Sequence, residues 1–183
     1  MKKVVLLLVL ISIVLPGLSQ NEKIYVVRNG KLSVTTYYKD SLLRVRSNEL
    51  KVTLDYETGD IAITLNPKSL RTGLDSLDIQ LTETSFRDII FLGNIGITNL
   101  NLSNDPEQEI TVIGNLTLND ITLPVIFQGK LKEWREGPGI GGILYLHSDF
   151  PISGFNLMNS HEGFSEYICV EIFDALLLDN GSR

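Results

Sequence analysis

The stretch from Glu109 to Leu131, EITVIGNLTLNDITLPVIFQGKL, constrains the fold more than any other part of the sequence. On each side of Asn119-Asp120, apolar residues recur at alternate positions, a period typical of a strand with one buried face. Asn and Asp tolerate the positive φ that a two-residue hairpin turn requires. The stretch therefore predicts an antiparallel hairpin. Its inner face would carry Ile110, Val112, Leu116, Leu118, Ile121, Leu123, Val125, Phe127 and Leu131, and its outer face Thr122, Pro124, Gln128 and Lys130.

Most of the remaining chain consists of short apolar segments separated by turn residues. Asn29-Gly30, a strong hairpin signal, predicts a turn between strands at 24–28 and 31–38. The last strand is expected at 165–173, followed by a tail at 174–183. The spacing predicts eight to ten short strands, which is typical of an all-β sandwich or barrel.

Lys68 to Leu81 is the one segment that favours a helix. Leu70, Leu74, Leu77 and Leu81 recur at three- and four-residue spacing, although Gly73 is unfavourable within a helix. The segment follows Asn66-Pro67, which ends the preceding strand because proline has no amide hydrogen for the ladder. A short helix or a loop with one helical turn is expected here, either as a plain connection between strands or as a lid over an opening.

The hairpin also resembles a known family. GNLTLNDITLPVIF is similar to the hairpin of YceI-like proteins, in which a threonine-rich strand turns and continues through threonine, proline and valine. The matching residues are Gly114, Leu116, Thr117, Leu118, Ile121, Thr122, Pro124 and Val125. Asn119-Asp120 stands where the family usually has His-Gly, and the segment after Thr72-Gly73 is shorter than usual. At the level of pattern, the resemblance extends over residues 24 to 173.

The resemblance implies a lipocalin-like antiparallel β-barrel of about eight strands that holds an isoprenoid or another long-chain lipid. A barrel of this size either fills its interior with side chains or encloses one small ligand. The alternation alone leaves both possibilities open. A barrel with a filled core would be a structural or adhesion module, and a barrel with an enclosed ligand would be a binding protein. The residues expected to face the interior and contact a ligand are Leu54, Ile63, Leu116, Leu118, Leu123, Val125, Phe127 and Leu144.

Residues 1–19 have the three-part form of a secretory signal peptide. Lys2 and Lys3 precede an apolar run from Val4 to Leu15, and the segment ends in small residues at Ser19. A predominantly apolar run of twelve residues is too short to cross a bilayer comfortably, so no membrane insertion is expected. Residues 20–183 are then one extracytoplasmic domain, periplasmic or secreted in a bacterium.

The expected cleavage gives a mature protein that begins near Gln20. N-terminal sequencing of the soluble protein from the producing cell measures this directly. Soluble protein that retains Met1 would contradict export by this route.

The chain is acidic, with a formal net charge of −6 and a pI near 4.9, and removal of Lys2 and Lys3 makes it more acidic. This balance argues against nucleic acid and anionic membrane surfaces, which both require basic patches. Cys169 is the only cysteine, so the chain forms no internal disulfide. Its place in an apolar strand predicts a buried small hydrophobic residue.

No catalytic, cofactor or metal site is expected. Gly137 to Gly142 matches G-x-G-x-x-G, but a β-like segment follows it where dinucleotide binding requires a helix. His147 and His161 do not form a recognised ligand pattern. Ser160-His161-Glu162 places triad residue types next to one another, and chain neighbours rarely reach triad geometry.

Overall fold

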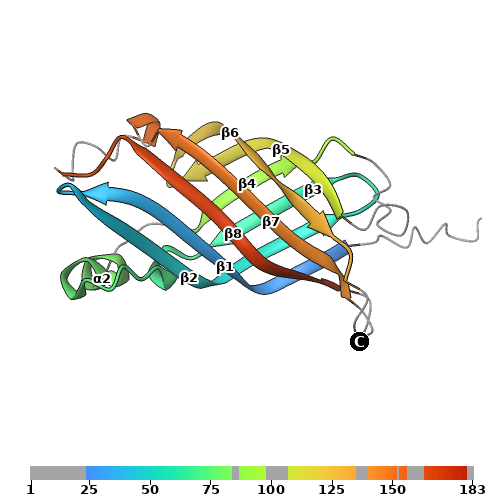
Figure 1. Ribbon diagram of the computed structural model, residues 1–183, viewed down its shortest axis with the longest axis horizontal. Helices are drawn as coiled ribbons and strands as arrows, with labels where there is room; N and C mark the ends of the chain where they lie inside the picture. Colours follow the sequence, from blue (N-terminus) through green and yellow to red (C-terminus); the bar gives the residue numbers. More distant parts are fainter. Residues whose placement is uncertain are drawn as a thin grey trace, which may run out of the picture.

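The computed structural model describes residues 24–83, 87–97, 107–134, 140–151, 153–155 and 163–180. Its strands form a closed antiparallel barrel of eight, in which each pairs with its neighbours in the chain and β8 pairs with β1 (Figure 1). The strands are β1 (Ile24–Tyr38), β2 (Ser41–Asp55), β3 (Asp60–Leu65), β4 (Ile89–Asn94), β5 (Glu107–Leu118), β6 (Ile121–Lys132), β7 (Ile140–Pro151) and β8 (Tyr167–Asp179). The all-β barrel with one short α-helix that the sequence predicts is confirmed.

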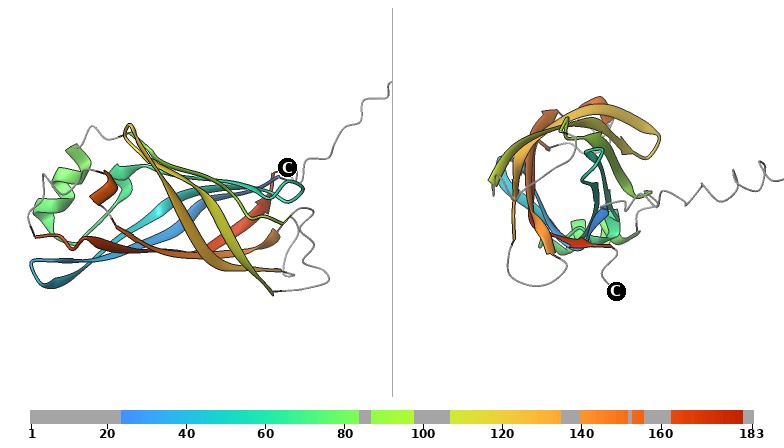
Figure 2. Two further views of the ribbon diagram at one scale, coloured as in Figure 1. Left: turned by 90° about the horizontal axis from the view of Figure 1, so that it is seen from above. Right: turned by 90° about the vertical axis from the view of Figure 1, so that its right-hand side faces the viewer.

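The two ends of the barrel differ. One end, called the helix end below, carries α2 (Asp75–Glu83) and the β1–β2 and β5–β6 turns; the short helices η1 (Pro67–Ser69) and η2 (Ser153–Phe155) also lie there (Figures 1 and 2). The opposite, far end carries the turn between β2 and β3 and the last residues of β8. The expected leader and His161 lie outside the described residues. No helix in the described ranges is long and apolar enough to span a bilayer.

The central hairpin has the predicted register. β5 and β6 pair along their whole length, from Glu107 opposite Lys132 to Leu118 opposite Ile121. Asn119 takes the positive φ that the turn requires, at 56°. The predicted inner residues are buried or half-buried, whereas the predicted outer residues are exposed.

The predicted hairpin at Asn29-Gly30 is wrong. Residues on both sides of this pair face the same neighbouring strand, with Val27 opposite Val52 and Leu32 opposite Ser47. The register shifts between these pairs, so Asn29-Gly30 is a β-bulge within one continuous strand. The chain reverses later, at Lys39-Asp40, where both residues have positive φ values of 47° and 62°.

The predicted tail from residue 174 is also wrong, since β8 continues to Asp179. Asp174 has a φ of 51° and lies at a register shift against β7. Ile172 faces the interior, the next two residues do not, and Ala175 and Leu177 are again fully buried. This bulge breaks the alternation by one residue, which is why the sequence pattern ends there.

The predicted helix at 68–81 is displaced and divided. Asn66 caps η1, accepting a hydrogen bond from the Lys68 amide at 2.9 Å, and Gly73 then interrupts the helical path with a φ of 78°. The α-helix begins only at Asp75 and ends at Glu83. None of its residues is buried, so the leucine spacing does not mark a core-facing stripe.

The far half of the barrel is packed with side chains. Tyr25 and Tyr56 stack at that end with ring centroids 4.2 Å apart, and burial raises the pKa of the Tyr56 hydroxyl. Behind them lie residues that are completely shielded from solvent: Leu54, Val112, Leu131, Leu144, Ala175 and Leu177. This half of the interior has the close packing of an ordinary protein core.

Candidate ligand-binding cavity

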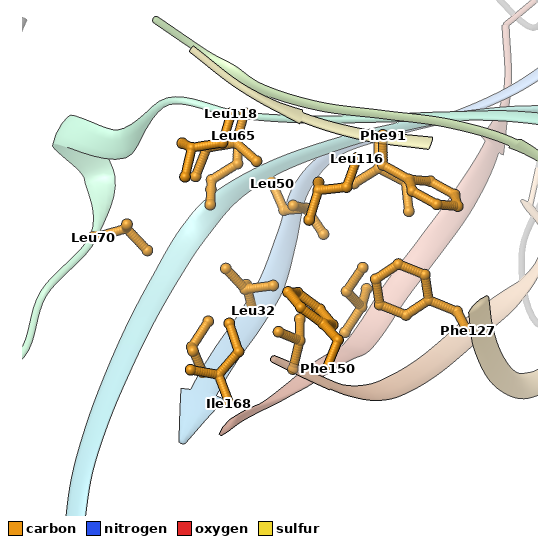
Figure 3. Close-up of a pocket in the computed structure, with 15 residues that line it drawn as sticks. Leu32, Leu50, Leu65, Leu70, Phe91, Leu116, Leu118, Phe127, Phe150 and Ile168 are labelled. Carbon is orange, nitrogen blue, oxygen red and sulfur yellow. The ribbon is translucent and has the colours of Figure 1, made fainter. Parts of the chain in front are cut away.

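A cavity of about 140 Å³ occupies the helix-end half of the barrel (Figure 3). Every side chain that lines it is apolar, and each of the eight strands contributes at least one. The lining residues are Leu32, Val34, Leu50, Ile63, Leu65, Leu70, Ile89, Phe91, Leu116, Leu118, Phe127, Phe150, Ile168, Val170 and Ile172.

The predicted ligand-contacting residues divide between the cavity and the rest of the interior. Four of them line the cavity: Ile63, Leu116, Leu118 and Phe127. The other four do not: Leu54, Leu123, Val125 and Leu144. Leu54 and Leu144 belong to the packed far half, Val125 is buried in the wall beside Gly114, and Leu123 lies against Gly154 of η2.

Alternation separated the inner from the outer face, but it carries no information on how far along the barrel axis a residue lies. Leu54 of β2 and Ile63 of β3 both face inward, and their two strands are paired, yet only Ile63 lines the cavity. The cavity residues of β1 and β8, such as Leu32 and Val170, were missed although both strands show the same pattern. Only the register of all eight strands locates the cavity.

Two aromatic rings separate the cavity from the packed half. Phe91 and Phe127 meet edge to face, with centroids 5.1 Å apart, and lie at the end of the cavity away from Leu70 (Figure 3). Gly93 and Gly114 face each other on β4 and β5 beside Phe91. A Cβ atom at Gly93 would lie 2.8 Å from the Phe91 ring, and one at Gly114 would lie 2.6 Å from it. The two glycines therefore make room for this ring against the barrel wall.

The opposite side of the cavity is bounded by Leu70, which follows η1. Anchors on both sides hold it: the Ser69 and Ser47 hydroxyls are 2.7 Å apart, and Arg71 exchanges two 2.8 Å backbone hydrogen bonds with Arg46. This contact with β2 fixes the segment beside the cavity, whereas α2 contributes no buried residue.

No polar side chain lines the cavity. Ser148 donates a hydrogen bond to the Ile126 carbonyl at 2.7 Å, and Thr36 donates to the Tyr167 carbonyl at 3.3 Å. The buried polar side-chain atoms that lack a partner among the described residues belong to Ser33, Tyr56 and Gln108, and none of these lines the cavity. The side chains of the cavity wall therefore provide no hydrogen-bonding group.

In the described ranges, no group of three or more His, Cys, Asp or Glu side chains is placed to hold a metal ion. His147 is exposed on the outer wall, and Gly141 and Gly142 belong to β7, not to a helix N-terminus.

Cys169 differs from its prediction as a buried residue. It is half-buried on the outer face, opposite Asp149 of β7 and Thr35 of β1. Partial burial, together with the Asp149 carboxylate, raises the pKa of its thiol to about 11. The group therefore remains a protonated, unreactive thiol at neutral pH.

Comparison with known proteins identifies the fold. No protein-family model matches the chain, and no curated protein matches it. Among solved structures, a polyisoprenoid-binding domain from Saccharophagus degradans implicated in plant cell wall breakdown has a TM-score of 0.63 at 12% identity, covering 87% of this chain and 99% of that one. BcnA of Burkholderia cenocepacia has a TM-score of 0.59 at 12% identity, covering 81% and 95%.

A mutant CJ YCEI protein is also similar, with a TM-score of 0.58 at 15% identity over 75% of this chain and 85% of that one. Identities of 12–15% establish a shared fold and nothing finer. At that level they agree with the resemblance to YceI-like proteins that the hairpin carries.

Proposed function

We propose that this protein is an exported, non-enzymatic binding protein that holds an apolar chain-like molecule in the helix-end cavity. The observation that carries the proposal is a cavity of about 140 Å³ lined only by apolar side chains. The side chains that line such unfilled space lose the dispersion contacts that they would make in a filled core. An engineered apolar cavity of about this size in another protein stays dry and binds benzene.

Binding would be driven by removing methylene groups from water, at about 0.8 kcal/mol for each one buried. A polar or charged ligand would lose its hydration without finding a partner, because every side chain that lines the cavity is apolar. The fold shared with a polyisoprenoid-binding domain supports the same class of ligand. The signal-like segment at residues 1–19 supports an extracytoplasmic location.

The competing role is a structural or adhesion module with a filled core. The packed far half agrees with such a module, whereas the hollow helix-end half favours a ligand. The two roles differ in whether the cavity is occupied in the protein as it is produced.

Protein purified without detergent is expected to release an apolar compound on organic extraction, close to one molecule per chain. Leu118→Trp is expected to abolish this, because the indole would occupy space that is empty beside Leu118. Asn115→Trp is the matched control, since Asn115 is exposed on the outer face of the same strand. Native mass spectrometry of the three proteins measures the occupancy.

If wild-type protein shows only the bare chain mass, and added apolar compounds do not raise its Tm, the module is the better description. In a filled core the same tryptophan would only lower stability, by about 1–3 kcal/mol.

A further inference from the structure

We propose that Phe91 and Phe127 form a floor that fixes how deeply a chain enters, so that the barrel selects a short apolar chain end of about six carbons. This inference rests on the proposed function and adds a length limit to it. The resemblance implies a long-chain lipid, and one solved structure with this fold is a polyisoprenoid-binding domain. In this structure only the helix-end half of the interior is open to a ligand chain.

The size of the cavity sets the first limit. About 140 Å³ is close to the volume of an engineered cavity that holds one benzene molecule, a ligand of six carbons. A longer chain gains further burial only if it passes the two rings.

The rings are held from several sides. Phe91 and Phe127 are 2% and 3% exposed, and their edge-to-face contact is a favoured aromatic geometry. Gly93 and Gly114 allow the Phe91 ring to lie against the wall, and Phe127 is backed by its cross-strand neighbour Val112.

The interior beyond the floor offers no continuation of the cavity. Leu54, Leu131 and Leu144 lie nearer the far end than the rings do and are completely buried. None of them lines the cavity, although all three face the interior. A chain that passed the floor would have to displace this packing, so added methylenes remain at the helix end instead.

The test is a titration of the purified protein, after removal of any bound compound, with 1-alkanols from butanol to decanol. For the wild type, affinity is expected to rise about fourfold per methylene up to about hexanol and then to level off. Calorimetry gives the dissociation constant for each alcohol. The ratio of heptanol to hexanol affinity reports the depth of the floor.

Phe127→Leu lowers the floor and is expected to raise that ratio from near one to about fourfold. Phe150→Leu is the matched control, because Phe150 lines the cavity wall from the helix-end part of β7. This control changes the width of the cavity and not its depth, so its affinities change while the ratio stays near one. Phe91→Leu serves as the second floor variant, and a thermal melt confirms that each variant is folded.

The floor is refuted if wild-type affinity keeps rising from hexanol to decanol, or if the two floor variants leave the ratio unchanged. It is also refuted if Phe150→Leu shifts the ratio as much as Phe127→Leu does. These outcomes leave the proposed function intact, since alcohols still bind. If no alcohol binds the wild type at any length, the proposed function itself is contradicted.

Discussion

Phe127→Ala lowers the free energy of unfolding by about 3–5 kcal/mol, as other large-to-small changes at buried aromatic sites do. Phe127 is 3% exposed, meets the Phe91 ring edge to face, and faces Val112 across the hairpin. Its removal joins the existing cavity to a new one, and the strands cannot collapse far enough to fill both. Urea titration followed by circular dichroism measures the change.

Thr122→Ala is the control on the same strand and costs less than about 1 kcal/mol. Thr122 is exposed on the outer face, where its hydroxyl lies 2.9 Å from that of Thr117. Equal losses for the two variants would mean that the hairpin register is displaced by one residue.

Leu144→Ala lowers the free energy of unfolding by about 2–5 kcal/mol, because it opens a cavity in the packed far half. Leu144 is completely buried between Leu131 of β6 and Ala175 of β8. The same substitution at Leu118 costs at most about 2 kcal/mol, since that half-buried side chain borders space that is already empty. The two variants are compared by denaturant titration with ligand removed.

The difference between these leucines separates a half-hollow barrel from a uniformly packed one. Losses of the same size at Leu118 and Leu144 would indicate that the helix-end half is as well filled as the far half. The dependence of the unfolding free energy on denaturant concentration should be the same for the two variants. Equal slopes would show that both variants expose the same amount of surface on unfolding.

The hairpin at 107–132 could be predicted because its alternation is unbroken and its turn residues have one clear geometry. The first strand could not be predicted in full, because Asn29-Gly30 is compatible with both a hairpin turn and a β-bulge. Which of the two forms depends on β2, whose residues pair with both sides of the dipeptide. That information is non-local and absent from the pattern.

The end of β8 illustrates a second limit. Asp174 introduces an extra residue, so the inward positions shift from even to odd numbers between Ile172 and Ala175. A pattern that changes phase has the same local appearance as a pattern that stops. The β7 neighbours that continue the pairing identify it as a strand.

The periodicity of the sequence does not predict where the cavity lies, because the cavity depends on how the inward side chains pack. Ile63 and Leu54 both take inward positions in alternating strands, yet Ile63 lines the cavity and Leu54 belongs to the packed core. The glycine pair that makes room for the Phe91 ring, Gly93 and Gly114, could be taken for a source of strand curvature from the sequence alone.

The central claim is that an apolar ligand occupies the helix-end half of the barrel and leaves the far half unchanged. Methyl NMR spectra of leucine-labelled protein, recorded with and without 1-hexanol, measure this residue by residue. Shifted methyl signals are expected for Leu50, Leu65 and Leu118, which line the cavity, and unchanged signals for Leu54, Leu131 and Leu144. Shifts of equal size in both groups, or in neither, would contradict it.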